Sequence, residues 1–213
     1  MVYGSAMGHP EIIEHADAIR IADWIERRLG SALETTDGRV AITVPGGSTP
    51  FPILRELTDR ELEFARLEVW PNDDRIVPED HEASNTGKIR ALLEPVGAKV
   101  VALTAEGKPP HFVLTWLGMG ADGHVASLFP NTDPDPRDPQ PVRRLTPEPL
   151  PPHAPFDRIT LTMPSLLNSD TILFTLGGAK DKRAMFEAAS RGEHDLPVAR
   201  LLASAQQAVT CFA

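Results

Sequence analysis

The chain has 213 residues, of which 41% are hydrophobic and 24% charged, so one domain over residues 1–213 can bury a core without disulfides or a metal. A net charge of −9 argues against a nucleic-acid partner, because phosphate backbones are bound by clustered lysine and arginine. The chain start lacks the pattern of a signal peptide and no segment has the length of a membrane span, so we expect a cytoplasmic protein whose single cysteine, Cys211, is reduced and buried.

The first part of the chain predicts a helix, a strand and a glycine-rich turn. Apolar residues recur at helical spacing from Ile12 to Leu29 and Gly30 follows, which is typical of an amphipathic helix closed by glycine. Residues 39–44 form a β-branched run that predicts a buried strand. This strand ends at the turn Pro45-Gly46-Gly47-Ser48-Thr49-Pro50, before a short helix over residues 53–57.

The strands predicted in the middle of the chain also end in polar or glycine-rich loops. Residues 67–70 lead into the charged loop Asn72-Asp73-Asp74-Arg75, and Ser84-Asn85 can then cap a helix that runs to Leu93. After a strand over residues 99–103, the apolar run 112–117 enters Gly118-Met119-Gly120.

The last third begins with a proline-rich segment. Ten of the 21 prolines lie in residues 130–155, which therefore cannot hold a regular helix or a central strand and are predicted to form an extended surface loop. Beyond it we expect strands over residues 158–162, 171–176 and 207–212, and a helix from about residue 181 to residue 190.

Strands that alternate with helices, each strand rich in valine, isoleucine and leucine, predict an α/β fold with a mostly parallel sheet covered on both faces. In such sheets ligands lie beyond the carboxyl ends of the strands. Three loops are predicted at that edge, formed by residues 46–49, 73–75 and 118–124. We expect the active site there.

The loop Gly46-Gly47-Ser48-Thr49 suits a phosphate, because it offers uncrowded backbone N–H groups, two hydroxyls and a following helix N-terminus. Taken alone, it is slightly more typical of a tight turn than of a phosphate site. Ser48 as a hydrolase nucleophile is disfavoured, since Pro50 stands where a nucleophile elbow needs its second glycine. The loop also lacks the lysine of a nucleotide-binding P-loop.

The segment Gly118-Met119-Gly120-Ala121-Asp122-Gly123 matches the spacing of a dinucleotide fingerprint. That fingerprint requires a following helix and a second strand that ends in an acid, whereas here the chain enters the proline-rich segment. We therefore interpret the match as fortuitous and expect no cofactor.

His124 and its charged surroundings are candidates for acid/base chemistry. An imidazole in a glycine-flanked turn at a strand end can titrate near neutral pH, although a lone loop histidine is usually only solvated. Asp73, Asp74 and Arg75 can be an ordinary surface cluster, and Lys180, Lys182 and Arg183 near a helix start are better explained by an anionic ligand than by the helix dipole. The histidines show no metal-binding spacing, so no metal is predicted.

Three segments together resemble the 6-phosphogluconolactonase family. They are residues 45–50, the segment Asp73-Asp74-Arg75-Ile76-Val77-Pro78 with Ser84-Asn85, and the long block 117–130, Leu-Gly-Met-Gly-Ala-Asp-Gly-His-Val-Ala-Ser-Leu-Phe-Pro. Their order and spacing match the family over most of the chain, and the block 117–130 is the specific signal. Residues 158–162 with 167–168, and residues 178–183, are similar to the closing portion of the family.

The resemblance implies a Rossmann-like fold shared with sugar-phosphate isomerases and deaminases. It also implies hydrolysis of 6-phospho-D-glucono-1,5-lactone in the oxidative pentose phosphate pathway. His124 would be the general base, and either Asp122 or Asp73 would orient it. The phosphate would be held by the loop residues Gly46, Gly47, Ser48 and Thr49, by Arg75 and by one lysine. That lysine aligns with either Lys180 or Lys182.

The chain departs from the family pattern at two places. Asp74 stands where the family usually has glutamate, and only Thr104 to His111 connect two strands that an extra helix usually separates, so we expect that wall of the cleft to be reshaped.

Two other functions stay open at this point. A related deaminase would place a catalytic glutamate where this chain has Phe129, which disfavours deaminase or isomerase chemistry. A non-catalytic sugar-phosphate sensor would normally carry a DNA-binding segment, and the stretch before the first predicted strand is too short and too acidic for one. The sequence does not decide the oligomeric state.

Overall fold

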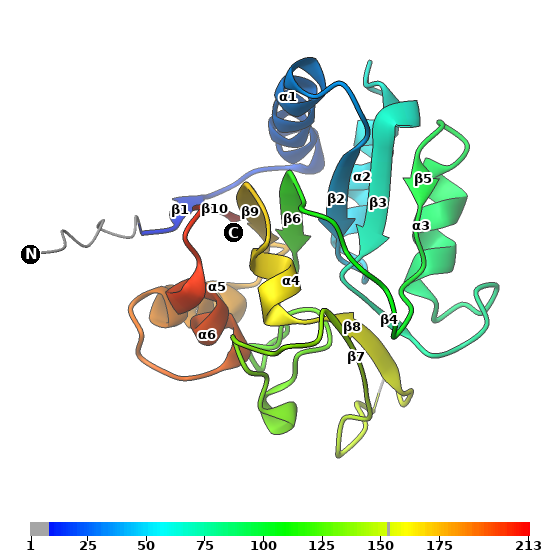
Figure 1. Cartoon of the computed structure of the whole chain (residues 1–213). Helices are drawn as coiled ribbons and strands as arrows, with labels where there is room; N and C mark the ends of the chain where they lie inside the picture. Colours follow the sequence, from blue (N-terminus) through cyan, green and yellow to red (C-terminus); the bar gives the residue numbers. More distant parts are fainter. Residues whose placement is uncertain (1–8, 153) are drawn as a thin grey trace, which may run out of the picture.

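A computed structural model describes residues 9–152 and 154–213 of the protein, which are built around a parallel sheet (Figure 1). Within these residues the sheet has seven strands in the order β1-β10-β9-β6-β2-β3-β5, and all neighbours are parallel. The strands are, in chain order, β1 (Glu11–Ile13), β2 (Val40–Val44), β3 (Leu67–Pro71), β5 (Lys99–Val100), β6 (Leu114–Leu117), β9 (Thr171–Thr175) and β10 (Ala208–Phe212).

The strand order reverses direction at β2. From β2 the chain builds β3 and β5 on one side, then crosses to β6 on the other side and continues to β9 and β10. The strands β2 and β6 are therefore neighbours whose following loops lead to opposite sides of the sheet, which leaves a crevice between these two loops. Open α/β sheets bind their ligands at such a reversal.

Helices cover both faces of the sheet, as predicted. The helices are α1 (Ala18–Thr35), α2 (Pro50–Thr58), α3 (Asn85–Leu93), α4 (Met163–Leu167), α5 (Lys180–Ser190) and α6 (Pro197–Ser204). The first three pack in one core and the last three in a second core on the opposite face. Alternation along β2 divides the strand between the two cores, since Val40 and Ile42 belong to the first and Ala41 to the second.

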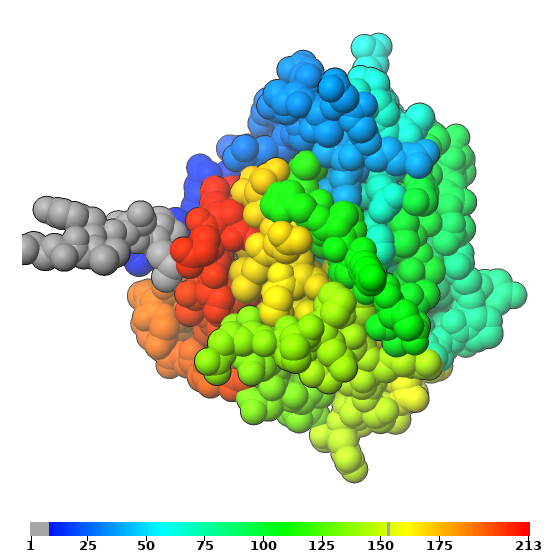
Figure 2. Space-filling view, viewed as in Figure 1, coloured from blue at the N-terminus to red at the C-terminus, as the bar shows by residue number. Residues whose placement is uncertain are grey.

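A small antiparallel sheet lies near the carboxyl ends of the main strands (Figure 1). Its strands are β4 (Asp73–Arg75), β8 (Arg158–Leu161) and β7 (Val142–Leu145), with β8 in the middle. One expectation was wrong here, because residues 73–75 form a strand and not a loop. The strand predicted over residues 158–162 is confirmed as β8, which belongs to this antiparallel sheet and not to the parallel one. The proline-rich segment lies on the surface of the molecule (Figure 2) and contributes β7, an edge strand, which is where proline-flanked strands are tolerated.

The first helix is placed differently from the prediction. Ile12 lies in β1, which pairs with β10, and α1 begins at Ala18 with the Asp17 side chain accepting from the Arg20 N–H at 2.8 Å. The helix passes through Gly30 and continues to Thr35, because Leu33 extends its buried face. An apolar run that serves first an edge strand and then a helix explains why the spacing alone misplaced both ends.

Three short elements, β1, α4 and α6, were not predicted from the sequence. Cys211 is buried in β10, as expected, and burial raises the pKa of its thiol to about 12.

None of the helices in the described residues is long and apolar enough to cross a membrane.

Candidate active site

A cleft of about 310 Å³ opens where the chain leaves β2, β6 and β9. It brings together nearly all the residues that the sequence singled out, which come from four separate segments. Its lining includes Gly46, Gly47, Ser48, Thr49, Asp73, Arg75, Gly120, His124 and Lys182. Asp122 lies behind His124 and does not line the cleft, and neither does Lys180.

His124 is held by the turn that contains it. Gly120 donates its N–H to the His124 carbonyl at 2.9 Å, and Gly123 donates to the Gly120 carbonyl at 3.1 Å. The imidazole Nδ1 lies 2.6 Å from Oδ1 of Asp122. Because an ionised carboxylate only accepts hydrogen bonds, Nδ1 carries the proton in the neutral form of the ring, and Nε2 then has the free lone pair.

The contact with His124 also acts on Asp122. The hydrogen bond to His124 lowers the pKa of the Asp122 carboxyl group, so Asp122 stays ionised beside the ring. The carboxylate is about half exposed, with 54% of its side-chain surface accessible, so solvent screens its charge.

Two glycines are required by the close approach of side chains to the loops. A Cβ on Gly120 would lie 2.1 Å from Cε1 and 2.2 Å from Nδ1 of His124. A Cβ on Gly46 would lie 2.2 Å from the side-chain amide carbon of Asn85. Larger residues at these positions would displace the imidazole or Asn85.

Phe129 forms an apolar wall beside His124. The two ring centroids are 4.7 Å apart and the rings are tilted by 43°. Phe129 is buried. An apolar ring therefore stands beside the imidazole at the position where a related deaminase would place its catalytic glutamate.

Asp73 carries the second acidic group of the cleft. Its carboxylate accepts a hydrogen bond from the Ser127 hydroxyl. The residue as a whole is half-buried, but its carboxyl group is surrounded by protein atoms, and this burial raises the pKa of Asp73 although Ser127, Arg75 and His124 oppose the shift. No hydrogen bond joins Asp73 to His124 among the described residues.

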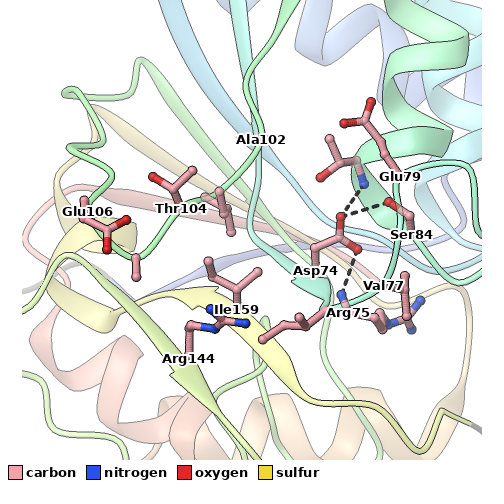
Figure 3. Close-up of a pocket in the computed structure, with 14 residues that line it drawn as sticks. Asp74, Arg75, Val77, Glu79, Ser84, Ala102, Thr104, Glu106, Arg144 and Ile159 are labelled. Atoms are coloured by element: carbon pink, nitrogen blue, oxygen red, sulfur yellow. Dashed lines mark hydrogen bonds between the residues drawn. The ribbon is translucent and has the colours of Figure 1, made fainter.

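Asp74, the next residue along β4, has a different role. Its buried carboxylate accepts backbone N–H bonds from Arg75 at 2.8 Å, Asn85 at 2.6 Å and Thr86 at 2.9 Å, and a hydroxyl bond from Ser84 at 3.1 Å. Figure 3 shows the bonds from Arg75, Thr86 and Ser84. Two of these donors are the first N–H groups of α3, which have no partner within the helix. Asp74 therefore fixes β4 to the start of α3.

The pocket drawn in Figure 3 lies beside Asp74 and has a volume of about 340 Å³. Ala102, Thr104 and Glu106 border it, so the short connection after β5 shapes this pocket. Residues 104–111 do not line the cleft that contains His124, and the expected effect of this short connection on the wall of that cleft stays a prediction.

Arg75 projects from the same strand into the cleft. Its Nη1 donates to the Ala83 carbonyl at 2.7 Å and to Oδ1 of Asn85 at 3.3 Å, whereas its buried Nε has no partner among the described residues. Asn85 in turn donates to the Asp73 carbonyl at 2.9 Å. Asn85 lines the cleft, although from the sequence it was expected only as part of a helix cap and of the family resemblance and not as a site residue.

The three basic residues near the start of α5 separate in the structure. Lys182 lines the cleft, and Lys180 is exposed outside it. Arg183 pairs with Glu14 at 2.7 Å and with Glu187 at 2.8 Å, so it needs no anionic ligand to explain it. Within residues 9–152 and 154–213, no three His, Cys, Asp or Glu side chains are grouped so as to hold a metal ion.

Comparison with known proteins gives consistent matches. The model of the family described as glucosamine-6-phosphate isomerases/6-phosphogluconolactonase matches residues 14–107 and 94–211. The 6-phosphogluconolactonase of Pseudomonas aeruginosa is 34% identical over 206 residues, which cover 85% of each chain. The 6-phosphogluconolactonase of Rhizobium meliloti is 30% identical over 219 residues, 90% of this chain and 92% of that protein.

Solved structures share the fold. The crystal structure of a 6-phosphogluconolactonase from Shewanella baltica has a TM-score of 0.82 at 24% identity and covers 98% of this chain and 99% of its own. That from Thermotoga maritima has a TM-score of 0.80 at 22% identity, with 95% and 98% covered. At this identity the structures support the Rossmann-like α/β architecture of the whole chain.

Proposed function

The chain belongs to the glucosamine-6-phosphate isomerase/6-phosphogluconolactonase family, and we propose that it hydrolyses 6-phospho-D-glucono-1,5-lactone to 6-phospho-D-gluconate. The observation that carries the choice within the family is the pair His124 and Phe129: a histidine with a free Nε2 lines the cleft, and an apolar ring stands beside it in place of an acid. Lactone hydrolysis needs a base for water and no further carboxylate there.

In the proposed mechanism, neutral His124 removes a proton from a water molecule through Nε2 as the water oxygen attacks C1 of the lactone. The bond between C1 and the ring oxygen then breaks, and the imidazolium returns the proton to that oxygen. General acid/base help of this kind contributes roughly 10²–10⁴-fold. The lactone is an activated ester, so no covalent enzyme intermediate is required.

Asp122 is the residue we propose to orient His124, because its carboxylate lies 2.6 Å from Nδ1. It also favours the imidazolium that forms during the reaction. Asp73, which also lines the cleft, is proposed to help stabilise that cation, since their charges interact although no hydrogen bond joins them.

The phosphate group is proposed to bind the loop Gly46-Gly47-Ser48-Thr49 at the start of α2, together with Arg75 and Lys182. Backbone N–H groups at a helix start and charge-assisted hydrogen bonds from cations suit a dianion. Of the two candidate lysines, we do not include Lys180 among the proposed phosphate ligands, because it lies outside the cleft.

We further propose that the chain acts as a single cytoplasmic domain. The main sheet supports one domain, because β1 near the start of the chain pairs with β10 near its end.

The test is a turnover assay. Purified protein is mixed with freshly prepared 6-phosphogluconolactone, and the formation of 6-phosphogluconate is followed against the spontaneous hydrolysis of the same lactone in buffer. We expect a rate that grows in proportion to protein concentration. A rate equal to the spontaneous background at every protein concentration would contradict the proposed function.

A further inference from the structure

A second groove opens from the catalytic cleft and runs between α2 and α3. It has a volume of about 750 Å³ and shares Gly47, Ser48 and Arg75 with the cleft. Its own side chains come from the two helices, which contact each other: Arg55 lies on α2 and Lys88 on α3, above apolar surface that includes Phe51 and Leu92. The groove therefore leads from solvent to the loop proposed to hold the phosphate.

The two cations of this groove are unneutralised. Arg55 and Lys88 are exposed, and in the described part of the chain neither side chain makes an ion pair or a hydrogen bond. The contrast within the same helical layer is clear, because Arg90 pairs with Glu79 and Glu94, and Arg60 pairs with Asp23. A chain of net charge −9 has ample carboxylates for pairing, yet it leaves these two cations free.

The groove is also free of opposing charge. No Asp or Glu is among the residues that line it, and Asp73 is the one acid among the described residues that line the cleft. Arg55, Lys88, Arg75 and Lys182 thus form a continuous cationic path from the surface to the cleft. On an acidic protein, such a local positive surface attracts a dianion that the rest of the molecule repels.

We propose that Arg55 and Lys88 form an entry site that binds the phosphate group of the incoming lactone and delivers it to Ser48 and Arg75. This inference rests on the proposed lactone hydrolysis. The entry site is distinct from the site of reaction, because Arg55 and Lys88 do not line the cleft that contains His124. The entry site speeds the capture of the substrate, so it raises kcat/KM and leaves kcat unchanged.

The test compares the double variant Arg55→Ala/Lys88→Ala with wild type at rising KCl concentration. At low ionic strength we expect kcat/KM to fall about 3–10-fold, at the lower end of what electrostatic steering supplies, with kcat retained. At about 0.5 M salt we expect the difference to disappear, because charges are then screened within a few ångströms. The variant Arg55→Glu/Lys88→Glu is expected to lose more, and thermal unfolding of each variant verifies that it folds.

The matched control is Arg20→Ala/Arg27→Ala. Both arginines are exposed on α1, neither makes an ion pair among the described residues, and their removal changes the net charge by the same amount. We expect its kcat/KM and salt dependence to match wild type. If the control loses as much as the groove variant, or if the groove variant loses nothing, the entry site is wrong while lactone hydrolysis stands.

A binding measurement separates this inference from the proposed function. Inorganic phosphate is titrated into each protein and followed by ³¹P NMR line broadening, which needs no turnover. We expect weaker phosphate binding in Arg55→Ala/Lys88→Ala than in the control variant. If the lactone is not hydrolysed but this difference in binding is found, the anion site stands and the proposed reaction fails. Equal binding in both variants would overturn the anion site.

Discussion

The two loops that meet at the cleft are held in different ways. Most hydrogen bonds of the histidine turn lie within it, among them the bond from Gly120 to the His124 carbonyl and the contact between Asp122 and the imidazole. One bond comes from outside, because Val198 of α6 donates its N–H to the Gly123 carbonyl at 3.1 Å. The phosphate loop depends on other segments: Asn85 from α3 packs against Gly46, and the loop after β9 packs against Thr49 through Gly177.

This difference separates the chemistry from the binding. The proposed base and its orienting carboxylate are two residues apart, whereas the proposed phosphate ligands come from the β2 loop, β4 and α5. We therefore expect substitutions in the histidine turn to lower turnover, and substitutions on the phosphate side to raise KM. The predictions below test that division, beginning with the largest effect.

His124→Asn is expected to lower kcat by about 10²–10⁴-fold, because asparagine cannot act as a base at neutral pH. Binding of 6-phosphogluconate, measured by calorimetry, is expected to stay close to wild type. A variant with unchanged kcat would remove His124 from the mechanism.

Arg75→Ala is expected to raise KM about 10–100-fold, since hydrogen bonds to charged groups contribute about 1.5–3 kcal/mol. The value of kcat is expected to change much less. Arg75→Lys is the matched variant, because it keeps the charge but loses the contacts with Ala83 and Asn85 that fix the guanidinium. Its KM is expected to lie between those of wild type and Arg75→Ala. If KM is unaltered in Arg75→Ala, the phosphate role of Arg75 is wrong.

Asp122→Asn is expected to lower kcat about tenfold and to leave KM near wild type. The amide oxygen can still accept from Nδ1, so the ring stays oriented, and the loss is the charge that favours the imidazolium. Because the carboxylate is about half exposed, this charge is screened and worth about 1–2 kcal/mol. A larger effect on KM than on kcat would contradict the division between the two loops.

Asp73→Asn is expected to stabilise the protein at pH 7. Burial raises the pKa of Asp73 above its unfolded value, so the ionised group costs stability above the folded pKa and costs nothing below the unfolded pKa of 3.8. The Tm of the variant should exceed that of wild type at neutral pH by about 2–4 °C for each kcal/mol relieved, and the difference should vanish below about pH 3.8. Equal Tm values at pH 7 would show that the ionised Asp73 carboxylate does not lower the stability of the folded protein.

Several features of the site were predictable because they are local. Glycines that follow apolar strand-like runs marked residues 46–49 and 118–124 as strand-end loops, and the structure places both on the cleft. The α/β fold and the parallel sheet followed from the alternation of elements, and both are confirmed. The charged segment 73–75 was recognised as part of the site, but not as a strand, because its pairing partner β8 lies more than 80 residues away.

The sequence by itself determined the fold class, the loops at the carboxyl ends of the strands and the motif around His124, because these depend on periodicity and on short segments. Only the tertiary structure decided which of Asp122 and Asp73 contacts His124, and which of Lys180 and Lys182 faces the cleft. It alone placed Asn85 at the site and brought Arg55 and Lys88 to one groove. These outcomes depend on the packing of α2, α3 and α5 against the sheet, which sets distances between residues that are far apart in the chain.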